Sequence, residues 1–178
     1  MNLPNILTFI RILSVPVIVL ILLIRYEGNE LIIFIIFILA AVTDSLDGYL
    51  ARKRRQITVF GKLLDPLADK LLIVSVFICF VELGLVPAWM VVIIVSREIA
   101  VTGFRALASS RGINISASVL GKVKMNSETI TIALLLLGER YLGKLYSIPQ
   151  IGLYLVIVTA VVSSIEYFIK YGPKVLSE

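Results

Sequence analysis

Six long runs of apolar residues most narrowly limit what this chain can fold into. They span roughly 5–26, 30–51, 63–82, 86–108, 119–138 and 148–170. A helix needs about 20 residues to cross the hydrocarbon core of a bilayer, and each run is about that long. The runs are continuously apolar, whereas the strands of a membrane β-barrel alternate between polar and apolar residues. We therefore predict an all-α integral membrane protein with six transmembrane helices, forming a single domain over residues 1–178.

The overall composition agrees with a membrane location. Hydrophobic residues make up 59% of the chain, with a mean hydropathy of +1.01, whereas soluble domains are about 45–50% apolar. One core built from 178 residues could not bury that much apolar surface. Water is therefore not the main solvent that we expect around this protein.

The distribution of Lys and Arg predicts the orientation. If the N-terminus is cytosolic, the outer loops contain only Arg25, Arg140 and Lys144, and the other 14 of the 17 basic residues lie on or near the inner side. Membrane proteins keep most of their Lys and Arg on the cytosolic side. We therefore expect both termini in the cytosol. The net charge of +5 then reflects this bias and a surface for anionic lipids, and no nucleic-acid partner is expected.

Two scarce residue types exclude whole classes of catalyst. The sequence has no His and a single Cys, Cys79, so it can form neither a Ser-His-Asp triad nor a cage of thiolates around a metal. Cys79 lies in an apolar run, and we interpret it as a small buried hydrophobic residue. Any catalysis must use carboxylates, hydroxyls, Lys, Arg or a bound metal.

Four aspartates lie inside or at the ends of two consecutive apolar runs. Asp44 and Asp47 are three residues apart, and Asp65 and Asp69 are four apart, so each pair shares one face of a helix. A charge at the centre of a bilayer costs roughly 2.5–3.5 kcal/mol, and such residues usually serve a function. The two helices are expected to be antiparallel, joined by the short basic segment 52–62, so that the pairs meet at similar depth.

Converging carboxylates repel one another and need either protons or a cation between them. Oxygen ligands without His or Cys favour hard divalent ions such as Mg²⁺ or Mn²⁺. Two such ions, bridged by shared carboxylates, would suit phosphoryl transfer. The sequence therefore predicts a metal site formed by these four aspartates.

Small residues and an arginine beside the aspartates indicate a phosphate ligand. Gly48 and Ala51 let a bulky ligand approach the helix backbone, and Arg52 can bind a phosphate through two parallel hydrogen bonds. Gly61 lies four residues before Asp65. Close packing between membrane helices is the alternative explanation for the small residues.

These positions form a signature of the pattern D-x2-D-G-x2-A-R-x8-G-x3-D-x3-D, which runs from Asp44 to Asp69 and agrees at all eight fixed positions. It resembles the signature of the CDP-alcohol phosphotransferase family. The resemblance covers the whole chain, since that family has six transmembrane helices and active sites that face the cytosol. It also implies a homodimer in the bacterial cell membrane, with membrane lipids around it.

Three further segments are similar to bacterial members of the family that make phosphatidylglycerophosphate. They are Asn2–Arg11, Ser96–Arg105 and Gly121–Lys124. Those members commonly continue the last segment with Thr and, three residues later, Gln. This chain has Met125-Asn126-Ser127-Glu128 instead. The departure bears on the choice of acceptor rather than on the chemistry.

The resemblance implies that CDP-diacylglycerol donates a phosphatidyl group to sn-glycerol 3-phosphate and that CMP leaves. It implies that Asp44, Asp47 and Asp65 bind Mg²⁺ or Mn²⁺, and that Asp69 joins them or acts as the general base. The expected donor-binding residues are Gly48, Ala51, Arg52 and Gly61, with Asn5 and Thr8 from the first helix.

The acceptor carries a dianionic phosphate and needs cations near it. Arg97, Arg105, Lys122 and Lys124 are the candidates, and Arg97 and Arg105 lie on nearly one helix face. Arg97 could instead pair with Glu98 or an aspartate. The two lysines could simply reflect the orientation of the chain in the membrane.

Two other functions remain open at this point. The same signature serves enzymes with another acceptor, such as inositol phosphate. Acidic residues in a membrane also mark ion pathways, so a divalent-cation transporter is an alternative. A pathway should spread its acids along the membrane depth, whereas the four aspartates gather near one side.

Overall fold

The computed structural model describes residues 3–24, 28–54, 59–113, 115 and 118–176. For residues 3–7, 44–54, 59–66 and 176 it describes the backbone alone. The described residues form six α-helices: α1 (Leu3–Ile24), α2 (Glu30–Arg54), α3 (Val59–Glu82), α4 (Ala88–Ser110), α5 (Val119–Leu142) and α6 (Ser147–Leu176). A short 3-10 helix, η1 (Gly143–Tyr146), joins the last two. Each helix overlaps one of the predicted apolar runs, and α3, α5 and α6 extend beyond theirs by about one turn or more.

Local sequence signals explain several helix ends. The turn between α3 and α4 contains Gly84 at φ +71°, a conformation that glycine adopts without steric cost. Pro87 precedes the first residue of α4, where a proline cannot interrupt the helical hydrogen bonds. At the start of α5 the hydroxyl of Ser118 accepts a hydrogen bond from the amide of Gly121 at 3.0 Å. This bond satisfies one of the unpaired amides of the first turn.

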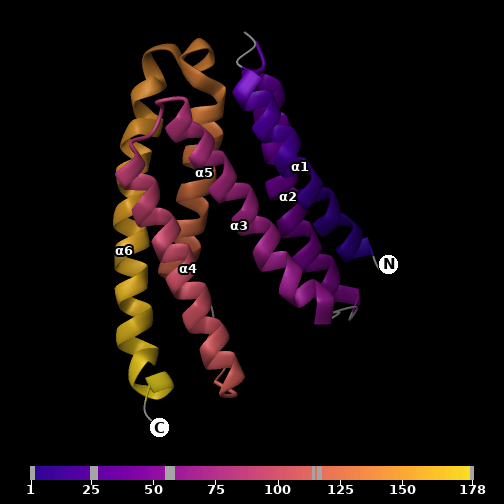
Figure 1. The fold of residues 1–178 in the computed structure, drawn as a ribbon, viewed down its shortest axis with the longest axis vertical. Helices are drawn as coiled ribbons and strands as arrows, with labels where there is room; N and C mark the ends of the chain where they lie inside the picture. Colours follow the sequence, from indigo (N-terminus) through magenta and orange to yellow (C-terminus); the bar gives the residue numbers. More distant parts are fainter. Residues whose placement is uncertain (1–2, 25–27, 55–58, 114, 116–117, 177–178) are drawn as a thin grey trace.

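The helices pack in two groups of three. Helix α1 packs against α2 and α3, while α6 packs against α4 and α5, and α2 joins the groups by packing on α5. Figure 1 shows the two groups close together at one end and apart at the other. The described ends of α1 and α6 lie toward the same end of the molecule (Figure 1). The two ends meet on one side because the chain has an even number of described helices that run alternately in opposite directions.

Two hydrophobic clusters form the interior. The larger one includes Ile18, Phe37, Phe77, Ile94 and Val156, and it joins both groups of helices. The smaller one lies between α4 and α6 and includes Phe104 and Tyr167. These clusters hold α2, α3, α4 and α5 in fixed register around the polar residues described below.

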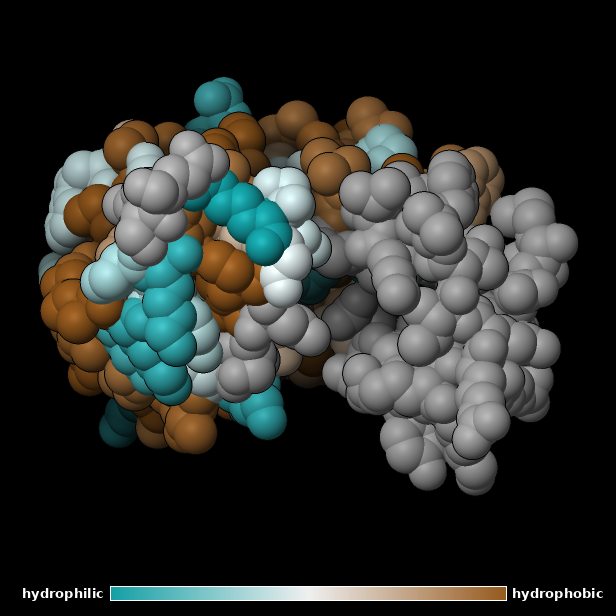
Figure 2. Space-filling model, turned by 90° about the horizontal axis from the view of Figure 1, so that it is seen from below, coloured by the Kyte–Doolittle hydropathy of each residue, from teal (hydrophilic) through white to brown (hydrophobic). Residues whose placement is uncertain are grey.

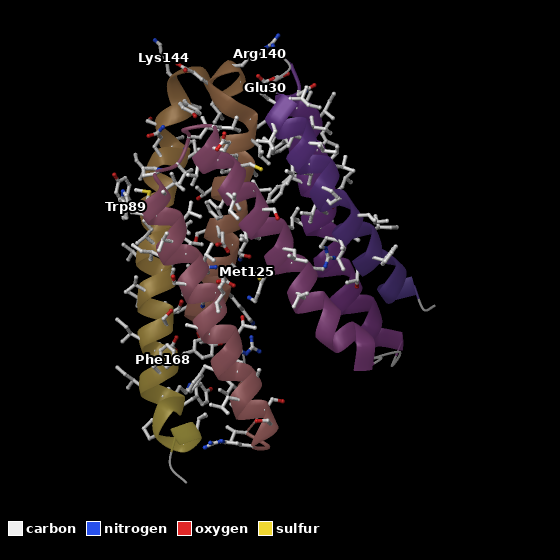
Figure 3. The ribbon with its side chains drawn as sticks, viewed as in Figure 1. Glu30, Trp89, Met125, Arg140, Lys144 and Phe168 are labelled. Atoms are coloured by element: carbon white, nitrogen blue, oxygen red, sulfur yellow. The ribbon has the colours of Figure 1, made fainter. Side chains whose placement is uncertain are left out.

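The outer surface is also apolar. Large hydrophobic side chains such as Val92, Ile151 and Ile169 are more than 60% exposed, and soluble proteins rarely expose apolar patches of this extent. Figure 2 views the molecule from below. In the coloured part of the surface, hydrophilic residues gather on the end that faces the viewer, and many of the residues around its edge are hydrophobic. Arg140 and Lys144 lie at the opposite end (Figure 3).

Among the described residues, one helical stretch, Val119–Val175, is long and apolar enough to cross a membrane by length and composition. The apolar helices Thr8–Ile24 and Glu30–Thr43 are shorter. No strand occurs in the described ranges, so the all-α class is confirmed for them. The six spans and the cytosolic position of both termini stay predictions, and Arg25 lies outside the described residues.

Candidate active site

The signature lies on α2 and α3, as predicted from its helical spacing. Asp44 and Asp47 belong to the second half of α2, and Asp65 and Asp69 to the first half of α3. The structure describes only the helical backbone of Asn5, Asp44, Asp47, Gly48, Ala51, Arg52, Gly61 and Asp65. The predicted convergence of the carboxylates and the donor-binding roles therefore stay predictions. Thr8 of α1 is described and is buried.

Asp69 is the one signature aspartate with a described side chain, and it lines a cavity between α2, α3 and α5. The cavity has a volume of about 220 Å³. Its other lining residues are Ala41 from α2, Leu72 and Ile73 from α3, and Met125, Asn126, Thr129 and Ile130 from α5. Figure 3 shows Met125 between α5 and α3. The carboxylate of Asp69 is thus placed where a small molecule could contact it.

A buried network of charged side chains lies beside this cavity. Glu98 of α4 is 8% exposed, and its carboxylate accepts hydrogen bonds from three cations. Lys70 of α3 donates to Oε2 at 2.6 Å, and Arg97 donates to Oε1 at 2.7 Å. The Nζ atom of Lys124 on α5 also donates to Oε1. We call these residues, together with Glu128 and Ser163, the Glu98 network.

Two more contacts extend the Glu98 network to α5 and α6. Lys124 donates a second hydrogen bond to Oε2 of Glu128, four residues later in α5, at 2.7 Å. Arg97 donates from Nη2 to the hydroxyl of Ser163 on α6 at 3.1 Å. The network therefore links α3, α4, α5 and α6. Two of its buried atoms, Nε of Arg97 and Oε1 of Glu128, have no hydrogen-bond partner.

The electrostatics of the Glu98 network follow from its composition. Three cations face two carboxylates, so the network as a whole carries one net positive charge. Buried charges are tolerated only when they are paired with good geometry, and Glu98 supplies that pairing for all three cations. The carboxylate of Asp69, the residue before Lys70, lies beside the network and formally balances this charge.

The structure separates the four predicted acceptor-binding residues into two pairs. Arg97 and Lys124 belong to the Glu98 network, which confirms the alternative that Arg97 pairs with Glu98. Arg105 on α4 and Lys122 on α5 have exposed side chains. Lys70, Glu128 and Ser163 were not predicted as site residues from the sequence. Each of the three is a polar residue within an apolar run, and this pattern could have singled them out. Glu128 also lies four residues after Lys124, a spacing that brings two side chains together on a helix.

Arg11 is a further buried cation, and the sequence alone predicted no role for it. It is 1% exposed, and its Nε atom donates a hydrogen bond to the carbonyl oxygen of Ala40 on α2 at 3.2 Å. In an α-helix the carbonyl of Ala40 also accepts the amide of Asp44, four residues later. Arg11 therefore attaches α1 to the turn of α2 where the aspartate signature begins.

Comparisons with known proteins show the family of the chain. A family model described as CDP-alcohol phosphatidyltransferase matches residues 1–164. The chain is 40% identical to a Bacillus subtilis protein named CDP-diacylglycerol--glycerol-3-phosphate 3-phosphatidyltransferase, over 95% of this chain and 94% of that protein. It is 35% identical to a Rickettsia felis protein of the same name, over 94% and 93%.

A Mycobacterium tuberculosis protein named "probable phosphatidylglycerophosphate synthase" is 36% identical, over 93% of this chain and 79% of that protein. The matches thus extend over nearly the whole chain, including both the aspartate signature and the Glu98 network. The protein belongs to the CDP-alcohol phosphatidyltransferase family.

Proposed function

We propose that this protein transfers a phosphatidyl group from CDP-diacylglycerol to sn-glycerol 3-phosphate, releasing CMP and forming phosphatidylglycerophosphate. One structural observation supports this proposal most directly. A carboxylate of the family signature, Asp69, lines a cavity beside a buried network that contains three cations. A carboxylate in this position can accept the proton of an acceptor hydroxyl. The names of the relatives support the same reaction.

We assign the metal site to Asp44, Asp47, Asp65 and Asp69. Among the described side chains, no group of three or more His, Cys, Asp or Glu residues could hold a metal, and three of the four aspartates lie outside them. The donor set still fits a hard ion, because it contains only carboxylate oxygens at helical spacing. When bound, Mg²⁺ or Mn²⁺, as one ion or two, neutralises the diphosphate of the donor.

The residues of the chain then have distinct tasks. The hydroxyl of glycerol 3-phosphate attacks the β-phosphorus of the donor, the bond to the CMP oxygen breaks, and Asp69 accepts the hydroxyl proton. Gly48, Ala51, Arg52 and Gly61 would line the cytidine diphosphate, with Asn5 and Thr8 beside them. The exposed cations Arg105 and Lys122 would bind the acceptor phosphate directly.

Arg97 and Lys124 would contribute mainly through their fixed positive charge, because both already bond to Glu98. Their guanidinium and ammonium groups favour an anionic acceptor without needing to leave the network. The proposed setting is the bacterial cell membrane, with six spans, both termini in the cytosol, the active site facing the cytosol, and a homodimer surrounded by membrane lipids.

An acceptor panel tests the proposed function. Purified protein is given CDP-diacylglycerol, Mg²⁺ or Mn²⁺, and either glycerol 3-phosphate, inositol phosphate or serine, and CMP release is measured. We expect CMP with glycerol 3-phosphate alone. Release with inositol phosphate and not with glycerol 3-phosphate would exclude the proposed acceptor. Divalent-cation flux in proteoliposomes without any CMP release would instead support a transporter.

Two aspartate variants separate the proposed roles. Asp69→Asn should abolish turnover while binding of CDP-diacylglycerol persists, because the amide cannot accept the hydroxyl proton. Asp44→Asn should weaken the metal-dependent binding of the donor. Binding is measured by equilibrium titration in detergent with and without Mg²⁺. Full turnover in Asp69→Asn would contradict its assignment as the base.

A further inference from the structure

Two residues that line the Asp69 cavity, one on α3 and one on α5, are each next in sequence to a lysine of the Glu98 network. On α3, Lys70 comes directly after Asp69. On α5, Lys124 comes directly before Met125, which lines the opposite wall. The position of each lysine is therefore tied through one peptide unit to the position of a cavity wall.

Glu98 holds both lysines although it belongs to a third helix and does not line the cavity itself. Its Oε2 atom accepts from Lys70 at 2.6 Å, while Oε1 accepts from Lys124 and from Arg97. Hydrogen bonds between ionised groups are shorter and stronger than neutral ones. The side chain of Lys124 is 3% exposed and that of Glu98 is 10% exposed, so water screens this pairing little.

We infer that Glu98 is a positioning residue that sets the separation of α3 and α5, and thereby the width of the cavity that receives the acceptor. Without its charge, Glu128, which is bonded to Lys124, would be the one carboxylate of the network left to balance its three cations. Their repulsion would move α3 away from α5. This inference rests on the proposed function for its kinetic consequences, but the helix separation can be measured without any substrate.

The kinetic test compares Glu98→Gln and Glu98→Asp with the unaltered protein in CMP release. Glu98→Gln should raise the KM for the acceptor about tenfold or more, since a misplacement of about 1 Å can cost up to about a hundredfold. The KM for CDP-diacylglycerol should stay within about twofold, because the donor-binding residues lie on α1, α2 and the start of α3. Glu98→Asp keeps the charge and should restore much of the acceptor affinity.

This split in KM distinguishes positioning from a loss of folded protein. A smaller folded fraction lowers the apparent kcat and leaves both KM values unchanged. Glu139→Gln is the matched control, because Glu139 is exposed and lies at the other end of α5. Both KM values of this control should equal those of the unaltered protein. An unchanged acceptor KM in Glu98→Gln, or an equal rise in both KM values, would overturn the inference.

A double-mutant cycle with Lys70→Met tests whether Glu98 acts through the network. If it does, the fold-loss of kcat/KM for the acceptor in the double variant should be much smaller than the product of the fold-losses in Glu98→Gln and Lys70→Met. Effects that multiply fully would mean that the two residues act independently, which would contradict the inference.

A distance measurement keeps the inference testable if the protein uses a different acceptor. Spin labels are attached at Leu71→Cys on α3 and Val123→Cys on α5, in a Cys79→Ala background. Both labelled positions are exposed, at 43% and 44%. The label separation should widen in Glu98→Gln and stay constant in Glu139→Gln. An unchanged separation in Glu98→Gln refutes the inference, whereas absence of CMP release with glycerol 3-phosphate refutes only the proposed function.

Discussion

Replacing Lys124 with Met should destabilise the fold strongly, because it leaves a buried carboxylate without a cation. Lys124 is 2% exposed and Glu128 is 4% exposed. Oε2 of Glu128 bonds to Lys124, and Oε1 has no partner. Met fills nearly the same volume as Lys, so the change removes charge rather than packing. Breaking a buried ion pair in this way costs about 3–5 kcal/mol of unfolding free energy.

The reverse change in the same pair should cost much less. In Glu128→Gln, the amide oxygen of the new side chain still accepts a hydrogen bond from Lys124, and Lys124 keeps its bond to Glu98. We expect a loss of about 1 kcal/mol, which is typical of one weakened hydrogen bond. The double variant Lys124→Met with Glu128→Gln removes the unpaired charge and should be more stable than Lys124→Met alone.

Reversible unfolding in mixed detergent micelles measures these differences. The fraction folded is followed by the fluorescence of Trp89, the single tryptophan of the chain, while the proportion of denaturing detergent is raised. The expected order of stability is the unaltered protein, Glu128→Gln, the double variant, and Lys124→Met. The reasoning is wrong if Lys124→Met is as stable as Glu128→Gln, or if the double variant is less stable than Lys124→Met.

Three other predictions concern packing, the first helix and the proposed metal. A Cβ atom in Gly152→Ala would lie 2.7 Å from Oγ1 of Thr131, so the variant should lose about 1–3 kcal/mol in the same unfolding assay, and Thr131→Ala should restore most of it. Arg11→Lys loses the Nε donor to Ala40 and should lower kcat/KM for the donor about tenfold, or about 1.4 kcal/mol; wild-type kinetics would contradict this. Chelation should abolish CMP release and added Mg²⁺ or Mn²⁺ should restore it, whereas full activity after exhaustive chelation would exclude the metal.

Most of the secondary structure was predictable because it depends on short-range interactions. A helix closes its hydrogen bonds between residues four apart, and each apolar run contains enough neighbours to do so. The run predicted at 86–108 corresponds to α4, Ala88–Ser110, which begins directly after Pro87. The run at 148–170 falls short of α6, which continues to Leu176. The last turns of α6 include Lys170 and Lys174. These lysines end the apolar run, but lysine favours a helical backbone, so the helix continues.

The position of the signature was predictable for the same reason. The spacing of the four aspartates is helical, and α2 and α3 have the helical backbone that this spacing requires. The absence of His, a property of the sequence alone, already restricted the possible ligands to oxygen. Chemistry that depends on residue type and local spacing can therefore be inferred from the order of residues in the chain.

The partners of the buried charges could be decided only by the tertiary structure. Glu98 meets Lys70 from 28 residues earlier and Lys124 from 26 residues later, and Arg97 meets Ser163 across 66 residues. No local pattern encodes such contacts, because they depend on how α3, α4, α5 and α6 pack. The sequence therefore determined which residues are charged within an apolar chain. Packing decided that Lys70 and Lys124 pair with Glu98, since a buried charge must find its counter-charge wherever the fold brings one within reach. The pair of Arg97 with Glu98 joins neighbouring residues, and the sequence had already offered it as an alternative.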